Sequence, residues 1–150
     1  MILFDSNILV LAHAENSPFH QSARQLRDQA AQGAIEACIS PQVLCEFYAV
    51  ITNERLVQPV LSASQARREV NTYWSAKRFH KIIPKETVMS RLVKLLDHHA
   101  IKRQDIFDAF LVATMLDNNL RTIYTQNVKD FEIFPKIQVV NPLEIATTPA

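Results

Sequence analysis

One segment near the C-terminal end of the chain most constrains the fold. Residues 106–116 (IFDAFLVATML) are apolar on nearly every side, which is typical of a helix buried in the core. A two-asparagine turn signal follows, and residues 120–125 are β-branched and aromatic, which predicts a short strand. Asp105 and Asp108 nevertheless lie at the start of the helix. Since a charged side chain on a buried helix is unfavourable unless it is paired or binds a metal, these acids indicate a functional site.

The rest of the chain alternates short apolar runs with amphipathic helices. Ser17-Pro18 and Ser40-Pro41 each predict a helix with serine as N-cap and proline at the first helical position, and Gly33 ends the first of the two. The predicted strands are residues 1–4, 34–39, 81–84, 120–125 and 137–140, and the predicted helices begin near residue 8 and span 18–32, 41–51, 64–77, 88–98 and 106–116. This alternation predicts an α/β fold with a largely parallel sheet.

The totals bound the class of protein. With 150 residues, 48% of them hydrophobic and 21% charged, the chain is expected to form one globular domain over 1–150, with 146–150 as a frayed tail. The net charge is +1, so any contact with nucleic acid must come from local patches of charge. Gly33 is the single glycine, which excludes a Walker loop and a GxGxxG dinucleotide turn.

The N-terminus and the cysteines indicate a cytoplasmic protein. The first ten residues contain an acid at position 5 and no basic stretch, unlike a signal peptide. No apolar run approaches the roughly 18 residues of a membrane helix. Cys38 and Cys45 do not form a CxxC pair, and we expect them to be buried, inert thiols.

Acidic and amide residues fall at the ends of the predicted strands. Asp5 ends the first strand, and Glu46 lies on the helix after the second. Asp108 begins the helix before the fourth strand, and Asn127 and Asp130 follow that strand. In an open parallel sheet, ligands bind outside the carboxyl ends of the strands. We therefore expect these side chains to meet.

Carboxylates gathered without Lys or Arg between them repel one another, and some of their pKa values rise. A hard divalent cation relieves that repulsion, and an all-oxygen ligand set suits Mg²⁺ or Mn²⁺. Such an ion activates water and stabilises charge on a phosphodiester. The residues therefore predict metal-dependent phosphodiester hydrolysis.

Four motifs in this order resemble a known family. They are Asp5-Ser6-Asn7, Glu46, Asp108-Ala109, and Thr125-Gln126-Asn127 followed by Asp130-Phe131. Together they resemble the PIN-domain family, and among its members the VapC-like toxin ribonucleases of bacterial and archaeal toxin–antitoxin pairs. The resemblance covers nearly the whole chain.

The resemblance implies a Rossmann-like, three-layer α/β/α sandwich around a central, mostly parallel sheet. It also implies a Mg²⁺- or Mn²⁺-dependent endoribonuclease that acts on RNA, often forms a homodimer and is silenced by a small antitoxin. Asp5, Glu46 and Asp108 match the three invariant acids of that family. Asn127 and Asp130 match the variable fourth position, where the neutral Asn127 would bind metal weakly or hold a water and Asp130 would supply the fourth charge.

Four further residues are expected to support the site. The resemblance assigns a hydroxyl to Ser6, where the family usually has Thr, and a phosphate- or water-positioning hydroxyl to Thr125. Asn7 either acts directly or forms an Asx turn. Asp105 either binds metal or caps the helix that follows it.

Other interpretations remain open at this stage. The neutral Asn127 also suits a non-catalytic PIN-like module that binds RNA or protein, and a small-molecule phosphatase would use similar acids. Lys102-Arg103 is the basic pair nearest the acids in sequence and is a candidate phosphate contact. Asp97 and Asp117 are expected at the surface. Leu56, Val57 and Val60 are candidates for a dimer interface.

Overall fold

Five short apolar runs form one sheet whose strands are all parallel, in the order β3-β2-β1-β4-β5. The computed structural model describes residues 1–143. The strands are β1 (Ile2–Phe4), β2 (Ala37–Ile39), β3 (His80–Lys81), β4 (Thr122–Tyr124) and β5 (Gln138–Val140). The helices are α1 (Ser6–His13), α2 (His20–Gln32), α3 (Pro41–Ile51), α4 (Ala63–Ser75), α5 (Val88–His98), α6 (Asp105–Asp117) and α7 (Val128–Phe131).

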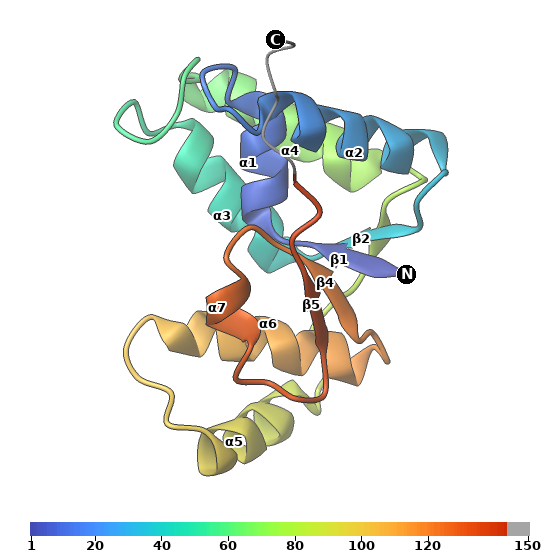
Figure 1. Cartoon of the computed structure of the whole chain (residues 1–150), viewed down its shortest axis with the longest axis vertical. Helices are drawn as coiled ribbons and strands as arrows, with labels where there is room; N and C mark the ends of the chain where they lie inside the picture. Colours follow the sequence, from blue (N-terminus) through green and yellow to red (C-terminus); the bar gives the residue numbers. More distant parts are fainter. Residues whose placement is uncertain (144–150) are drawn as a thin grey trace, which may run out of the picture.

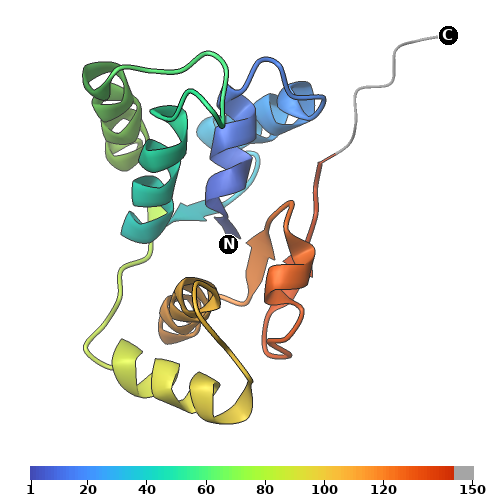
Figure 2. The same cartoon turned by 90° about the vertical axis from the view of Figure 1, so that its left-hand side faces the viewer.

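Helices cover both faces of the sheet. Figure 1 shows α1 to α4 on one side and α5 and α6 on the other, and the turned view in Figure 2 gives the same separation. The predicted three-layer α/β/α architecture with a parallel sheet is therefore confirmed. The predicted tail at 146–150 lies outside the described residues.

The order of the strands determines where a site can form. The connections from β1 and β2 run through α1 to α4, whereas the connection into β4 runs through α5 and α6. Because β1 and β4 are neighbours, the direction of the crossovers reverses between them. Loops diverge at such a switch point and leave a crevice beyond the carboxyl ends of the strands.

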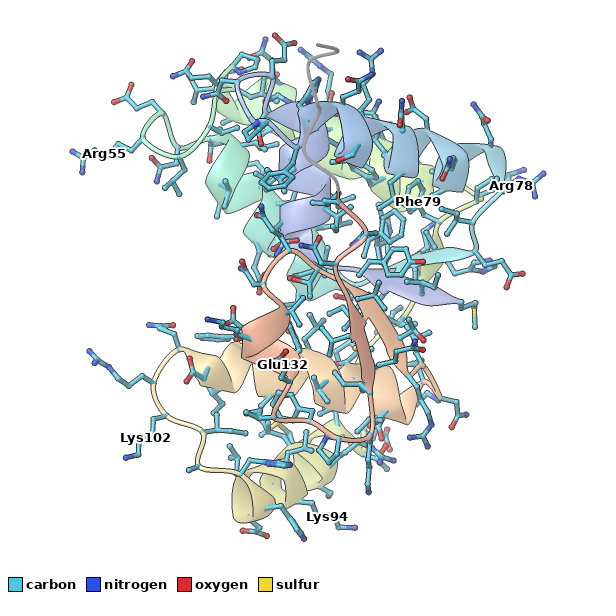
Figure 3. All side chains as sticks on the ribbon, viewed as in Figure 1. Arg55, Arg78, Phe79, Lys94, Lys102 and Glu132 are labelled. Carbon is cyan, nitrogen blue, oxygen red and sulfur yellow. The ribbon has the colours of Figure 1, made fainter. Side chains whose placement is uncertain are left out.

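The layer of α1 to α4 is joined to the sheet by a chain of aromatic rings. Phe4 on β1 packs edge-to-face on Phe79, with ring centroids 6.2 Å apart, and Phe79 packs on Tyr73 of α4 at 5.5 Å. Tyr73 packs in turn on Phe47 of α3, also at 5.5 Å. Figure 3 shows Phe79 between the sheet and these helices. The contacts fix α3, which carries Glu46, relative to β1, which Asp5 directly follows.

Several element boundaries differ from the prediction. Helix α2 begins at His20 and not at Pro18, because the Ser17 hydroxyl accepts a hydrogen bond from the Phe19 backbone within a turn. Strand β2 begins at Ala37 and not at residue 34, and β3 is His80–Lys81 and not 81–84. These strands extend only where β1 and β2 offer pairing partners. Helix α7, which follows Asn127, was not predicted.

The prediction that Asp117 lies at the surface is wrong. Its side chain is 2% exposed and forms an ion pair with Arg91 on α5. The Thr87 hydroxyl donates to its carboxylate at 2.9 Å, and Lys85 Nζ donates to its backbone carbonyl at 2.7 Å. Burial alone would raise the pKa of Asp117, but the hydrogen bonds from Arg91 and Thr87 outweigh burial and lower it. Asp117 therefore links α6 to α5 and to the segment that precedes α5.

The predictions that Cys45 is buried and that Val57 is a candidate for a dimer interface also need correction. Cys38 is buried as expected, but Cys45 is exposed on α3. Val57 is 3% exposed, so it belongs to the core, whereas Leu56 and Val60 are 62% and 39% exposed.

Within residues 1–143, no helix has both the length and the apolar character needed to cross a bilayer.

Candidate active site

Four carboxylates from four different elements line one pocket of about 350 Å³ at the switch point. Asp5 comes from the end of β1, Glu46 from α3, Asp108 from α6 and Asp130 from α7. Asn127 also lines the pocket, with Ser6 and Asn7. The structure thus brings together the five residues that were expected to meet there, and none of the described residues that line the pocket is Lys or Arg.

Asp5 caps a helix and also lines the pocket. One carboxylate oxygen caps α1 by accepting the Ser6 backbone N–H at 2.7 Å. The residue is 6% exposed. Burial raises the pKa of Asp5 and the charge of Glu46 adds to the rise, while the hydrogen bonds from Thr125 and Ser6 act against it.

The second carboxylate oxygen of Asp5 is held by two side chains. Thr125 Oγ1 donates to it at 2.7 Å, and Asn7 Nδ2 donates to it at 2.9 Å. Asn7 also accepts the Gln126 backbone N–H at 3.1 Å, and Thr125 Oγ1 accepts the Asn127 N–H at 3.0 Å. Thr125 itself is fully buried and does not line the pocket. This network joins the ends of β1 and β4 and fixes the direction of the Asp5 carboxylate.

Glu46 is oriented by a residue that the sequence did not reveal. Ser6 Oγ donates to Glu46 Oε2 at 3.0 Å, and Gln42 Nε2 donates to Glu46 Oε1 at 2.9 Å. Gln42 Nε2 also donates to the Phe107 carbonyl on α6 at 2.9 Å. A glutamine four residues before a glutamate on a helix is a local signal of such a contact, but only the packing of α3 on α6 shows the link to Phe107.

Asp108 has a strongly perturbed carboxyl group. Partial burial raises its pKa to about 7, and the charges of Asp130, Asp5, Glu46 and Asp105 add to the rise. The first turn of α6 is exposed, and burial begins at Ala109, so Asp108 stands at the boundary between core and pocket. A carboxyl group with this pKa marks a functional site when it lies in a cleft with other acids.

Asp105 is not part of the pocket lining. It is an exposed residue in the first turn of α6, and it acts on Asp108 only through its charge. The proposed capping role is wrong: Gln104 holds the N-cap position, and no side-chain cap hydrogen bond is present. The favourable interaction of an acid with the N-terminus of a helix remains as its structural role.

The donor set of the pocket fits a hard divalent cation in its chemistry. Carboxylate and amide oxygens are the ligands preferred by Mg²⁺ and Mn²⁺. Among residues 1–143, however, no group of three or more His, Cys, Asp or Glu side chains is already arranged around one ion position. Mg²⁺ commonly binds through one or two carboxylates and keeps several waters, so side-chain rotation or bridging water would be needed to complete a site here.

The family is established by comparison with known proteins. The family model described as "PIN domain" matches residues 2–136, so the chain belongs to the PIN-domain family. The resemblance seen in the four motifs is thereby confirmed.

Individual relatives share about a quarter or less of their residues with this chain. The chain is 26% identical over 143 residues to the Mycobacterium tuberculosis protein named Ribonuclease VapC24, covering 95% of this chain and 97% of that protein. A toxin-antitoxin complex from Klebsiella pneumoniae contains a chain with 25% identity and a TM-score of 0.62, covering 97% of this chain and 100% of that one. VapBC2 from Rickettsia felis, solved with a promoter DNA fragment, shares the fold with a TM-score of 0.68 at 18% identity over 94% of this chain and 98% of that one.

Proposed function

We propose that this protein is a Mg²⁺- or Mn²⁺-dependent endoribonuclease and the toxin of a toxin–antitoxin pair. The observation that carries the proposal is the convergence of Asp5, Glu46, Asp108 and Asp130 in one pocket whose described lining residues include no Lys or Arg. Membership of the PIN-domain family and similarity to a protein named Ribonuclease VapC24 support RNA as the substrate.

Asp5, Glu46 and Asp108 would hold the ion, with Asp130 and Asn127 completing its surroundings, mostly through water. The bound ion would supply a low-pKa water as nucleophile and positive charge for the phosphodiester. Asn7 and Thr125 keep Asp5 in place, and Ser6 and Gln42 keep Glu46 in place, through the hydrogen bonds described above. Burial and the neighbouring acids raise the pKa of Asp108 to about 7, so binding of a metal would compete with protonation of this carboxyl group near neutral pH.

The decisive test is cleavage of single-stranded RNA by purified protein. We expect cleavage in Mn²⁺ or Mg²⁺ and none in excess EDTA. A phosphate-monoester substrate run in parallel should remain intact, since its hydrolysis without RNA cleavage would favour the phosphatase interpretation instead. Persistent cleavage in EDTA would contradict the proposal.

Metal binding should also stabilise the fold. Because an ion that binds only the folded state adds about 2.7 kcal/mol at a hundredfold excess over its dissociation constant, Mn²⁺ should raise the melting temperature by roughly 5–10 °C. The measurement is a thermal melt in EDTA and then in increasing Mn²⁺, with Ca²⁺-free buffer. A melting temperature that stays constant up to millimolar Mn²⁺ would contradict a metal site formed by the free protein.

A second candidate function is RNA or protein binding without catalysis. It is favoured by the neutral Asn127 and by the absence, within residues 1–143, of a group of acids already arranged around one ion. The two functions separate in one experiment: a binding module retains RNA in Mn²⁺ without cutting it, whereas the nuclease produces new ends.

A substitution at Gln42 tests whether the orientation of the Glu46 carboxylate matters for metal-dependent cleavage. Replacing Gln42 with leucine removes the donor to Glu46 Oε1 and leaves that carboxylate held by Ser6 alone. Since loss of such an orienting contact typically weakens metal sites about tenfold, we expect the Mn²⁺ concentration for half-maximal cleavage to rise by that order, with a smaller change at saturating metal. The matched control is Gln29→Leu on the exposed face of α2, and equal metal dependence of the two variants would refute the role of Gln42.

An antitoxin and a second copy of the chain are the protein partners in this proposal. Apolar side chains at the surface support it: Trp74 is 39% exposed beside a hollow formed with Leu44 and Tyr48, and Phe107 is 54% exposed beside Met89. Leu56 and Val60 add to the exposed apolar surface. Light scattering of the isolated protein tests the homodimer, and co-purification with the product of an adjacent gene tests the antitoxin.

A further inference from the structure

A second cavity lies on the other side of α6 from the sheet, between α5, α6 and the segment that joins α7 to β5. It has a volume of about 360 Å³, within the usual range of small-ligand sites. Figures 1 and 2 show that this connecting segment descends from α7 along α6 toward the level of α5. The cavity therefore belongs to the same helical layer as Asp108 but is separate from the pocket of acids.

The rim of the cavity is basic. The nitrogen-bearing side chains that line it are those of Arg91, Lys94, His98, His99 and Lys136. None of the described residues that line it is acidic. Asp97 and Glu132 belong to the same elements but do not line the cavity, and Asp117 is engaged by Arg91, Thr87 and Lys85. This arrangement favours an anionic ligand.

Within residues 1–143, neither Lys94 nor Lys136 forms an ion pair that would compete with such a ligand. Lys94 and Lys136 are both exposed, and Figure 3 shows Lys94 projecting from α5. Arg121 Nη1 donates to the Lys136 backbone carbonyl at 3.2 Å, which places another cation beside this rim without using the Lys136 ammonium group.

The floor of the cavity is apolar and partly aromatic. Leu95 of α5 and Pro135 are its more accessible apolar side chains, whereas Val112, Leu116 and Phe134 line it with side chains that are only 0%, 8% and 2% exposed. The His99 ring packs edge-to-face on Phe134, with centroids 5.5 Å apart. This combination of a basic rim and an apolar floor distinguishes the cavity from lysines scattered over a surface. A ligand that satisfies both parts carries a negative charge and a flat ring whose face can pack on apolar side chains, and a nucleotide has this chemistry.

We propose that this cavity binds one nucleotide, with its phosphate at Lys94 and Lys136 and its base against the floor. As a site on the RNA, it rests on the proposed function. Asp108 and the lining residues Val112 and Leu116 are four and eight residues apart on α6, or about 6 and 12 Å along the helix axis. The floor of the cavity thus begins one to two helical turns from Asp108 along α6, and its basic rim would offset part of the repulsion between the acids and the RNA backbone.

The test measures binding in EDTA, so it does not depend on metal or cleavage. A labelled single-stranded RNA is titrated by anisotropy against wild type, against Lys94→Glu/Lys136→Glu, and against Arg68→Glu/Lys77→Glu. The last variant carries the same change of charge at exposed positions on and just after α4, on the other side of the sheet. Thermal melts confirm that all three proteins are folded.

We expect the cavity variant to bind RNA about tenfold or more weakly and with a lower salt slope, while the α4 control changes less than about twofold. Equal losses in both variants, or no loss in either, would overturn the proposal. Competition shows whether the bound nucleotide is free or part of a strand. If AMP displaces the RNA better than ribose 5-phosphate does, the site is open to free nucleotides. If AMP does not compete while the cavity variant still loses affinity, the nucleotide is part of a strand. Displacement by hexaglutamate as effective as by AMP would overturn the proposal in favour of an acidic peptide.

The two proposals fail differently. If RNA is cut in Mn²⁺ but Lys94→Glu/Lys136→Glu binds normally, the cavity assignment fails and the nuclease stands. If the cavity variant loses RNA affinity but no metal supports cleavage, the catalytic proposal fails and the nucleotide site stands.

Discussion

Replacing Asp108 with asparagine is expected to abolish RNA cleavage and, in the same protein, to raise the melting temperature of the metal-free form at pH 8. Cleavage should fall by more than the roughly hundredfold that loss of an orienting contact produces, because Asp108 would bind the ion directly. Asparagine is nearly the same size, and in the described part of the chain the Asp108 side chain takes part in no hydrogen bond that the substitution would break. The variant should therefore fold.

The gain in stability follows from the direction of the pKa shift. The pKa of Asp108 is about 7 in the folded protein and 3.8 for an ordinary Asp, so the folded state holds the proton more tightly. Stability from this group is present at low pH and is lost as the pH rises through 7, where the ionised carboxylate meets the other acids. The neutral amide of the Asp108→Asn variant has no such penalty. Discounted for partial exposure, the gain is about 1–2 kcal/mol, or several degrees, above pH 7 and vanishes below pH 4.

The control for this prediction is Asp97→Asn, which neutralises an exposed acid on α5 outside the pocket. It should cut RNA normally and melt as wild type does at every pH. Undiminished cleavage by Asp108→Asn would refute the catalytic proposal. A melting temperature lowered at pH 8 would show that Asp108 stabilises the fold through contacts instead of straining it.

Replacing Arg91 with methionine should cause the largest loss of stability among the ion pairs described here. Asp117, 2% exposed in its side chain, would keep its charge and lose its cation. Removing one partner of a buried pair typically costs 3–5 kcal/mol, and because the Arg91 side chain is 41% exposed we expect about 2–3 kcal/mol. The melting temperature should fall by roughly 5–10 °C.

The pH dependence gives this second prediction an internal check. The pKa of Asp117 is lowered in the folded protein, so its stabilising contribution is present above the ordinary pKa of 3.8 and is lost as the pH falls through the lower folded value. The difference between Arg91→Met and wild type should accordingly shrink in urea unfolding measured near pH 3. The matched control is Arg24→Met, which breaks an exposed pair with an N–O distance of 4.0 Å on α2 and should change the free energy of unfolding by less than about 0.5 kcal/mol. Equal losses in the two variants would contradict the role of Asp117.

Asp117 also shows why surface and core were hard to separate from sequence. Asp97 and Asp117 both stand near helix ends, and both were expected at the surface, but only Asp117 meets an arginine from the preceding helix. The partner lies 26 residues earlier in the chain, and its proximity depends on how α5 packs against α6. Local periodicity contains no information about that packing.

The prediction of where helices and strands begin and end was limited in the same way, because some of these boundaries depend on tertiary packing. Gly33 ends α2 with a positive φ of 82°, and Ser40 caps α3, as the local residues predict, because these effects operate within one turn. Strand lengths were overestimated at residues 34–39 because a strand ends where its neighbour stops offering hydrogen bonds, and β1 pairs with only the last part of that run.

The sequence by itself determined the parallel α/β fold, the family and the positions of the acids at strand ends, because apolar periodicity and residue type at each end are local properties. The sequence also predicted that Asp5, Glu46, Asp108 and Asp130 would meet. Only the tertiary structure decided that Asp105 lies outside their pocket, since that depends on which side of the helix faces the pocket. It also decided that Gln42 links Glu46 to α6, and that Lys94 and Lys136, 42 residues apart, border one cavity. Hydrogen bonds and electrostatic fields act through space over a few ångströms, and the folded chain alone sets which groups come within that range.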